Sequence, residues 1–123
     1  MMDGYKRQAS LMRALAHPMR LRILDILQES ECCVCHLTTV LKQRQPYVSQ
    51  QLMILREAGL VLDRKEGVIV YYRLADQRLV ALMESAREML RAMGVLVERA
   101  AIPTAPVRGC PCPKCNPGAS QVT

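Results

Sequence analysis

The chain has 123 residues, enough for one hydrophobic core and a tail but too few for two separate domains. Half of its residues are apolar, yet its only aromatics are four tyrosines, so aliphatic side chains must build the core, which favours packed helices. The formal net charge of +6 is compatible with binding a polyanion but does not establish it.

Apolar spacing and the positions of proline predict helices throughout the first half of the chain. A short helix is expected around residues 11–16, and a second begins at Pro18 and runs to about Glu29. A short third helix is expected from about Cys33 to Leu41. After a tight polar turn, a fourth runs from Pro46 to Ala58, with Val48, Leu52 and Leu55 on one buried face.

Two β-rich runs follow these helices. Leu60–Leu62 and Val68–Tyr72 flank the segment 63–67, which we expect to be the basic tip of a hairpin. Two short helices joined by a turn and followed by a hairpin predict a mainly α fold with a small β-hairpin, the winged helix-turn-helix. The fourth helix then has the recognition role.

A last helix is predicted from Asp76 to about Glu98. Its apolar residues recur every three or four positions, namely Leu79, Leu82, Met83, Ala86, Met89, Leu90, Met93, Leu96 and Val97. The small domain cannot cover a stripe of this length, so we expect a homodimer formed through terminal helices. A symmetric dimer also presents two recognition helices to double-stranded operator DNA.

The character of the chain changes after Ala101. Five prolines forbid a regular helix there, so we divide the chain into a DNA-binding and dimerisation domain at 1–100 and an irregular Pro/Cys-rich tail at 101–123. The tail carries Cys110, Cys112 and Cys115 within six residues. Such cysteines have no core to pack in, which favours metal capture or thiol redox chemistry.

No segment is apolar for long enough to span a membrane, and the first residues lack the pattern of a signal peptide, so we expect a cytoplasmic protein. In that reducing compartment, six cysteines favour metal ligands or redox thiols over a disulfide framework. Cys32, Cys33 and Cys35 form a thiol cluster just upstream of the expected recognition helix. A thiolate cluster beside a DNA-reading helix suggests a switch.

Candidate DNA contacts follow from the expected buried face of the fourth helix. Gln50 lies opposite that face, Tyr47 and Ser49 lie on its flanks, and Gln45 lies just before the helix. Glutamine pairs well with adenine edges, and hydroxyl groups commonly bind phosphate. Arg64 and Lys65 on the wing are expected to contact phosphates or the minor groove.

Several stretches together resemble a known family. They are 14–24, Cys33-Val34-Cys35, 48–52, 55–61, the wing residues 64–67, and 71–74. These stretches resemble the ArsR/SmtB metalloregulatory repressors over most of residues 10–98. The resemblance implies a dimeric winged-helix repressor that leaves its operator when a metal or metalloid binds, and Cys-Val-Cys is similar to the arsenical branch.

The resemblance carries Cys33 and Cys35 over as ligands of the inducer, trivalent arsenic or antimony. A third thiolate is expected, and Thr38 stands where some arsenical repressors have another cysteine, so Cys32 or a tail cysteine must substitute. Divalent Cd, Pb or Zn is the alternative inducer. A zinc-sensing branch uses Asp and His in the last helix, where this chain has no histidine, so we reject that site.

Helix geometry adds a constraint on the thiol cluster. Residues two apart in a regular helix project to nearly opposite sides, so Cys33 and Cys35 could share an ion only if the first turn unwound. Unwinding there would disturb the recognition helix. Cys32 and Cys35, three residues apart, could instead chelate an ion without unwinding.

Other classes of function remain open. A thiol redox-sensing repressor would form a disulfide through Cys32, Cys33 or the tail cysteines, and a haem sensor could use a cysteine as an axial ligand. We expect no enzymatic activity, because no spacing suggests a nucleophile with its base. His17 is expected to start a helix under the resemblance rather than to bind a metal. His36, beside Cys35, could belong to a mixed Cys/His zinc site, but a bystander role is preferred for both histidines.

Overall fold

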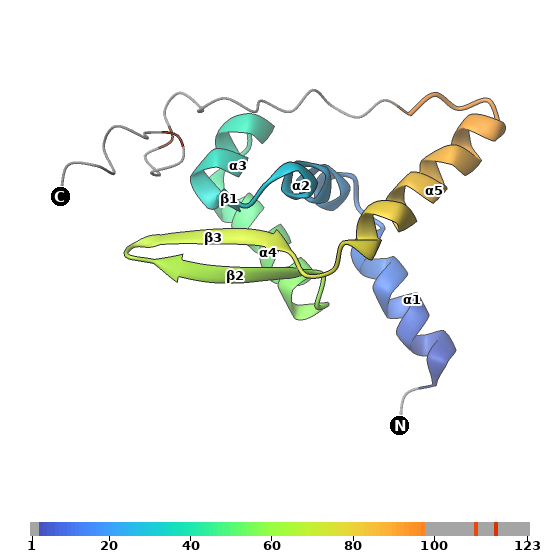
Figure 1. Ribbon diagram of the computed structural model, residues 1–123, viewed down its shortest axis with the longest axis horizontal. Helices are drawn as coiled ribbons and strands as arrows, with labels where there is room; N and C mark the ends of the chain where they lie inside the picture. The colour runs from blue at the N-terminus through green and yellow to red at the C-terminus, as the bar shows by residue number, and fades with distance from the viewer. Residues whose placement is uncertain (1–2, 98–109, 111–114, 116–123) are drawn as a thin grey trace.

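The computed structural model describes residues 3–97 together with Cys110 and Cys115 (Figure 1). Helices and a small sheet follow one another as α1 (Gly4–Leu15), α2 (Pro18–Glu29), β1 (Cys32–Cys33), α3 (Val34–Leu41), α4 (Gln45–Glu57), β2 (Val61–Glu66), β3 (Ile69–Leu74) and α5 (Arg78–Ala92). This confirms the predicted winged helix-turn-helix, with α4 as the second helix of the motif and β2–β3 as the wing. Every helix in the described part of the chain is too short or too polar to cross a membrane.

Local side-chain chemistry sets the beginnings of the first helices. The Asp3 side chain accepts the Lys6 amide ahead of α1. His17 caps α2, because its Nδ1 accepts the Met19 amide at 3.1 Å and Pro18 follows as the first helical residue. The prediction that His17 starts a helix is therefore confirmed.

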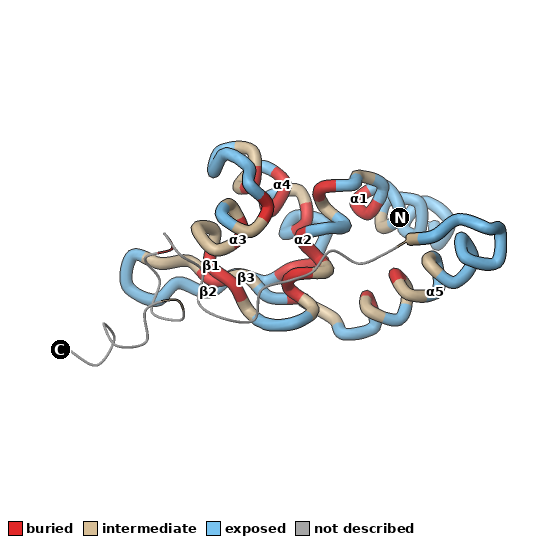
Figure 2. Tube along the Cα trace, turned by 90° about the horizontal axis from the view of Figure 1, so that it is seen from above, coloured by how far each residue is buried: buried red, intermediate tan, exposed pale blue. Residues whose placement is uncertain are grey.

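The core lies between the helices and one face of the sheet. Val48, Leu52 and Leu55 of α4 have no solvent exposure, as the apolar spacing predicted. Figure 2 shows the buried residues gathered in α2, α4 and the sheet, whereas the end of α5 is exposed. The opposite face of α4 is therefore exposed to solvent and accessible to a binding partner.

The sheet has three antiparallel strands in the order β1-β3-β2 rather than a hairpin alone. The sequence did not predict β1. The expected basic tip is also wrong in its bounds: residues 63–66 belong to β2 and pair with β3, and the turn falls at Gly67, whose φ of 63° favours glycine. Arg64 and Lys65 therefore lie in a strand of the wing and not at its tip.

The last helix is shorter than predicted. It ends at Ala92, and Gly94 follows with a φ of 85°, so Leu96 and Val97 lie beyond the helix and Glu98 lies outside the described residues. The expected apolar stripe is nevertheless exposed at its end, with Met89 68% and Met93 72% accessible. Figure 1 places α1 and α5 at the end of the molecule opposite the β2–β3 turn.

Candidate thiolate site and nucleic-acid interface

Cys33 lies where β1 passes into α3. It has an extended backbone, pairs with Tyr71 of β3, and is the N-cap of α3, with its sulfur accepting the His36 amide at 3.4 Å. The prediction that the third helix includes Cys33 is therefore wrong by one residue. Since Cys33 precedes the helix, the expected need to unwind the first turn no longer follows from geometry.

Cys32 faces the other side of the sheet. Successive residues of a strand point to opposite faces, and Cys32 belongs to the main hydrophobic core, where its thiol donates to the Ser30 carbonyl at 3.3 Å. Cys33 belongs instead to a second buried cluster with Tyr71 and Cys110, against which Cys35 packs. The expected alternative pairing of Cys32 with Cys35 thus requires residues of two different clusters.

The tail supplies two cysteines to this second cluster. Cys110 is 3% exposed, and its sulfur lies 3.4 Å from the Cys33 sulfur. The Cys115 sulfur lies 3.3 Å from Nδ1 of His36. Cys112 lies outside the described residues. Two contacts therefore connect the tail to the N-terminal end of α3.

The donors of this cluster have the right chemistry for a soft or borderline ion. Thiolates are the preferred ligands of thiophilic ions, and imidazole suits zinc. Among the residues that the structure describes, no three His, Cys, Asp or Glu side chains yet stand close enough together to hold a metal ion. The residues therefore fit such an ion in donor type, although the described part of the chain does not bring three of them together.

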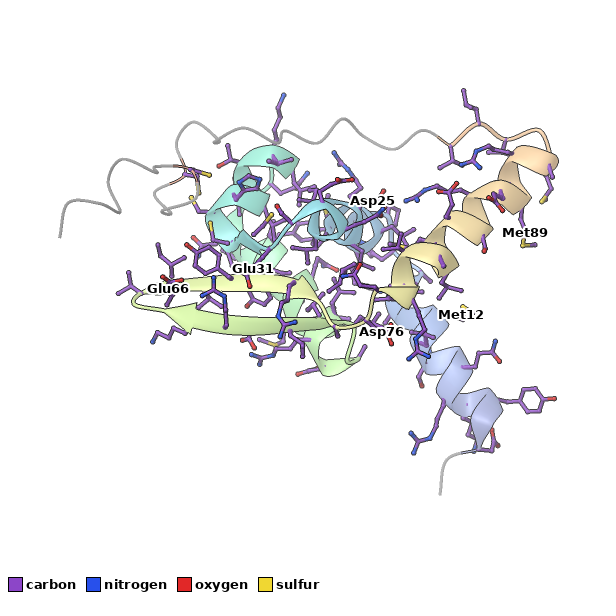
Figure 3. The ribbon with its side chains drawn as sticks, in the orientation of Figure 1. Met12, Asp25, Glu31, Glu66, Asp76 and Met89 are labelled. Atoms are coloured by element: carbon purple, nitrogen blue, oxygen red, sulfur yellow. The ribbon has the colours of Figure 1, made fainter. Side chains whose placement is uncertain are left out.

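Arg64 connects the wing to the same cluster. Its guanidinium forms a forked pair with Glu31, with contacts of 2.6 and 2.9 Å, and a further pair with Glu66 at 2.7 Å. It also lies 4.5 Å from the ring centroid of Tyr71, which packs against Cys33 and Cys110. Figure 3 shows Glu31 near the start of α3 and Glu66 close to the turn of the wing.

These partners modify the predicted role of Arg64. Hydrogen bonds to Glu31 and then to Glu66 raise the pKa of Arg64 above its ordinary value. Part of its charge is therefore already balanced inside the subunit. Lys65, on the neighbouring position of β2, is exposed and remains the simpler candidate for a phosphate contact.

The four DNA contacts that were predicted outside the wing, Gln45, Tyr47, Ser49 and Gln50, lie in the N-terminal half of α4. Gln45 begins the helix and is exposed together with Gln50, whereas Tyr47 and Ser49 are half-buried. Gln51 is turned inward and is 5% exposed. The exposed polar face is thus available to base edges, as direct readout requires.

Sequence reasoning missed Arg20, which joins three helices. Its guanidinium donates from α2 to the Ala14 carbonyl of α1 at 2.6 Å and to Oε1 of Gln51 in α4 at 3.0 Å. An arginine among the apolar residues of a buried helix was the available signal. Its contact with Gln51, 31 residues away, could not be read from the sequence.

Comparison with known proteins adds independent information. The family model for the bacterial regulatory proteins of the arsR family matches residues 17–62. The arsenical resistance operon repressor of Escherichia coli is 52% identical over 66 residues, which cover 53% of this chain and 56% of that protein. The arsenic resistance transcriptional regulator ArsR1 of Pseudomonas putida is 38% identical over 104 residues, covering 77% of this chain and 81% of that regulator.

Solved structures agree with the sequence matches. The homodimeric winged helix-turn-helix DNA-binding domain of a Mycobacterium bovis protein superposes with a TM-score of 0.65 at 31% identity. The superposition covers 76% of this chain and 89% of that domain.

Proposed function

The chain belongs to the ArsR family and is a transcriptional repressor of the ArsR/SmtB type, and from this we propose that it responds to trivalent arsenic or antimony. In this proposal Cys33, Cys35 and Cys110 bind the metalloid, and its binding releases the repressor from operator DNA. The contact between the Cys33 and Cys110 sulfurs, at 3.4 Å, carries this proposal. Cys35 packs against the same cluster, so inducer binding would have to bring its thiol together with those of Cys33 and Cys110.

The arrangement favours Cys110 over Cys32 as the third thiolate. Cys32 is buried on the core side of β1, so it could join Cys33 and Cys35 only if the strand turned over. Cys110 already lies on the correct side. The tail thereby supplies the ligand that Thr38 cannot.

The position of the cluster suggests how binding reaches the DNA-reading surface. Cys33 caps α3, and α3 packs against α4 across a tight turn at Lys42. Tyr71, which belongs to the same cluster, contacts Arg64 of the wing through its ring. An inducer that binds the released arrangement of these elements more tightly shifts the equilibrium away from DNA, since differential affinity is what moves such an equilibrium.

The repressor acts as a homodimer in this proposal. Met12 of α1 and Met89 of α5, labelled in Figure 3, line an apolar groove of about 660 Å³ between these helices and α2. Both side chains are exposed in the single subunit. A second copy that covers this groove would place two α4 helices on neighbouring major grooves.

A release titration tests the proposal. A labelled duplex, selected for tight binding from a random library, is saturated with reduced repressor, and arsenite is added while fluorescence anisotropy is followed. We expect release from wild type and from the control Cys32→Ser, but none from Cys35→Ser, which should still bind the duplex. Release of Cys35→Ser at the wild-type arsenite concentration would contradict the assignment.

A redox-sensing repressor is the second candidate function. The Cys33 and Cys110 thiols are close enough to be joined as a disulfide after small movements. Each residue is only 3% exposed, however, whereas redox sensors keep their thiols accessible to oxidant. Burial therefore ranks metalloid binding first, and release by hydrogen peroxide without any metalloid would reverse that order.

A further inference from the structure

The guanidinium of Arg20 connects α1 to α4 through directional hydrogen bonds. From α2 its Nε donates to the Ala14 carbonyl at 2.6 Å and its Nη2 to the Arg13 carbonyl at 3.2 Å, both in the last turn of α1. Its Nη1 donates to Oε1 of Gln51 in α4 at 3.0 Å. We propose that Arg20 and Gln51 are positioning residues, which fix the recognition helix to α1 and thereby set the spacing of the two operator half-sites.

The end of α1 that Arg20 contacts is also the part that borders the apolar groove. Met12, Leu15 and Ala16 line this groove and lie on either side of the two carbonyls along the chain. In the proposed homodimer, on which this inference rests, the second copy covers the groove. Arg20 therefore joins the surface that would contact the partner subunit to the helix that would read DNA.

The hydrogen bond to Gln51 restrains the rotation of α4 about its own axis. The Gln51 side chain is 5% exposed, whereas the neighbouring Gln50 is exposed and is the predicted base contact. Successive side chains of a helix are about 100° apart, so the direction of one determines that of the other. With side-chain ends about 5–6 Å from the axis, a rotation of about 20° moves the Gln50 amide by about 2 Å. A hydrogen bond to a base edge does not survive such a displacement.

Apolar packing supplies a weaker restraint on this rotation. Val48, Leu52 and Leu55 of α4 are fully buried, but burial of apolar surface has no preferred direction. The bond to Gln51 does have one, because the guanidinium presents its donors in a rigid plane. Since two α1 carbonyls hold the same plane, α4 keeps one orientation relative to α1.

The half-site spacing that the repressor accepts tests this connection. The duplex selected by the wild type is altered by inserting or deleting two base pairs between its half-sites, which turns one half-site by about 70° relative to the other. The wild type should bind these altered duplexes at least about tenfold more weakly than the selected duplex. This ratio of affinities is the spacing penalty.

Two variants break the connection from its two ends. Gln51→Leu keeps a buried side chain of similar size but removes the acceptor, so the spacing penalty should fall to about threefold or less. Arg20→Lys should give an intermediate penalty, because an ammonium group cannot reach all three acceptors. Adding Arg20→Lys to Gln51→Leu should lower the penalty no further, since the connection is already broken.

Rescue and stability controls separate positioning from a general loss of stability. Gln51→Glu keeps an acceptor for Arg20, so it should weaken binding to every duplex through its charge while the spacing penalty stays at the wild-type value. Ile23→Val removes a buried methylene from α2 and should lower stability, but it leaves the Arg20 donors and their acceptors in place and should not change the penalty. Circular dichroism at the assay temperature should show every variant folded.

A penalty of tenfold or more retained in both Gln51→Leu and Arg20→Lys would overturn the inference. So would a penalty in Ile23→Val as low as that in Gln51→Leu, because the effect would then follow stability. Either result leaves the homodimer and the arsenite response intact, since the wild type would still discriminate between spacings and arsenite would still release it. A wild type that binds all spacings equally would overturn the homodimer proposal together with this inference.

Discussion

Replacement of Arg20 should weaken the fold at the point where α1, α2 and α4 meet. Its guanidinium donates to the carbonyls of Ala14 and Arg13, at 2.6 and 3.2 Å, and to Oε1 of Gln51 at 3.0 Å. The two carbonyls belong to the last turn of α1, and that of Arg13 also accepts the amide of Ala16, the C-cap residue, at 3.2 Å. One side chain therefore satisfies acceptors from two other helices.

The cost of Arg20→Ala follows from what is left behind. The bond to Ala14 is partly buried and comes from a charged donor, which is worth about 1.5 kcal/mol after water competes for the carbonyl. Gln51 is 5% exposed, and removing the partner of its oxygen costs about 1–3 kcal/mol. We expect a loss of about 3 kcal/mol, which lowers Tm by roughly 12 °C or more.

Urea unfolding followed by circular dichroism measures this loss, with the protein concentration held fixed because a dimer's stability depends on it. Arg20→Lys should lose about half as much, since an ammonium group cannot reach three acceptors in one plane. The control Arg73→Ala, at an exposed position of β3, should change stability by less than about 0.5 kcal/mol.

A double-mutant cycle identifies the source of the effect. If the loss arises from Gln51, then Arg20→Ala should cost about 1–2 kcal/mol less in the Gln51→Leu background than in wild type. Equal costs in both backgrounds, or a total loss below about 1 kcal/mol, would refute the reasoning.

Other consequences can be measured independently. Lys65→Ala should reduce the slope of log affinity for DNA against log salt concentration by about one. Gln50→Ala should instead reduce the difference in affinity between selected and random duplexes. A changed salt slope for Gln50→Ala together with a changed sequence preference for Lys65→Ala would contradict both roles. Arg87→Ala should lower the free energy of unfolding in urea by about 2–3 kcal/mol, because it breaks the ion pair with Asp25. The two side chains of this pair are only 11% and 13% exposed, and an unchanged urea midpoint would contradict the expectation. Partial burial, and after it the charge of Asp63, raises the pKa of the Tyr72 hydroxyl above its ordinary value of 10.0. The contribution of this group to stability is therefore present below pH 10 and is lost as the pH rises through the folded-state pKa. Tyr72→Phe should reduce this loss of stability at alkaline pH, and a pH profile identical to that of wild type would contradict the assignment.

Local patterns predicted most of the helical fold. Proline at a helix start and apolar spacing placed α2 and α4 within a residue or two, and Val48, Leu52 and Leu55 are buried as expected. The strand β1 escaped prediction because it has two residues and depends on pairing with Tyr71 and Tyr72, far along the chain. The end of α5 was misplaced because the apolar stripe continues past Gly94, which stops the helix.

The sequence predicted which cysteines belong to the candidate site but not which of them are in contact. The spacing of Cys33 and Cys35 drew attention to the start of α3, and the tail cysteines suggested a second group of ligands. Which tail cysteine meets which residue depends on contacts across 77 and 79 positions. Such contacts are set by tertiary packing, so neither Cys110 beside Cys33 nor Cys115 beside His36 could be deduced from spacing.

The most direct test of the metalloid site is the number of sulfur atoms bound to arsenic, measured by X-ray absorption on the reduced repressor with one arsenite per subunit. We expect three sulfur neighbours in wild type and in Cys32→Ser, and two sulfurs with one lighter atom in Cys35→Ser and in Cys110→Ser. Three sulfurs retained in Cys110→Ser, or one lost in Cys32→Ser, would contradict the assignment of Cys33, Cys35 and Cys110 as the inducer site.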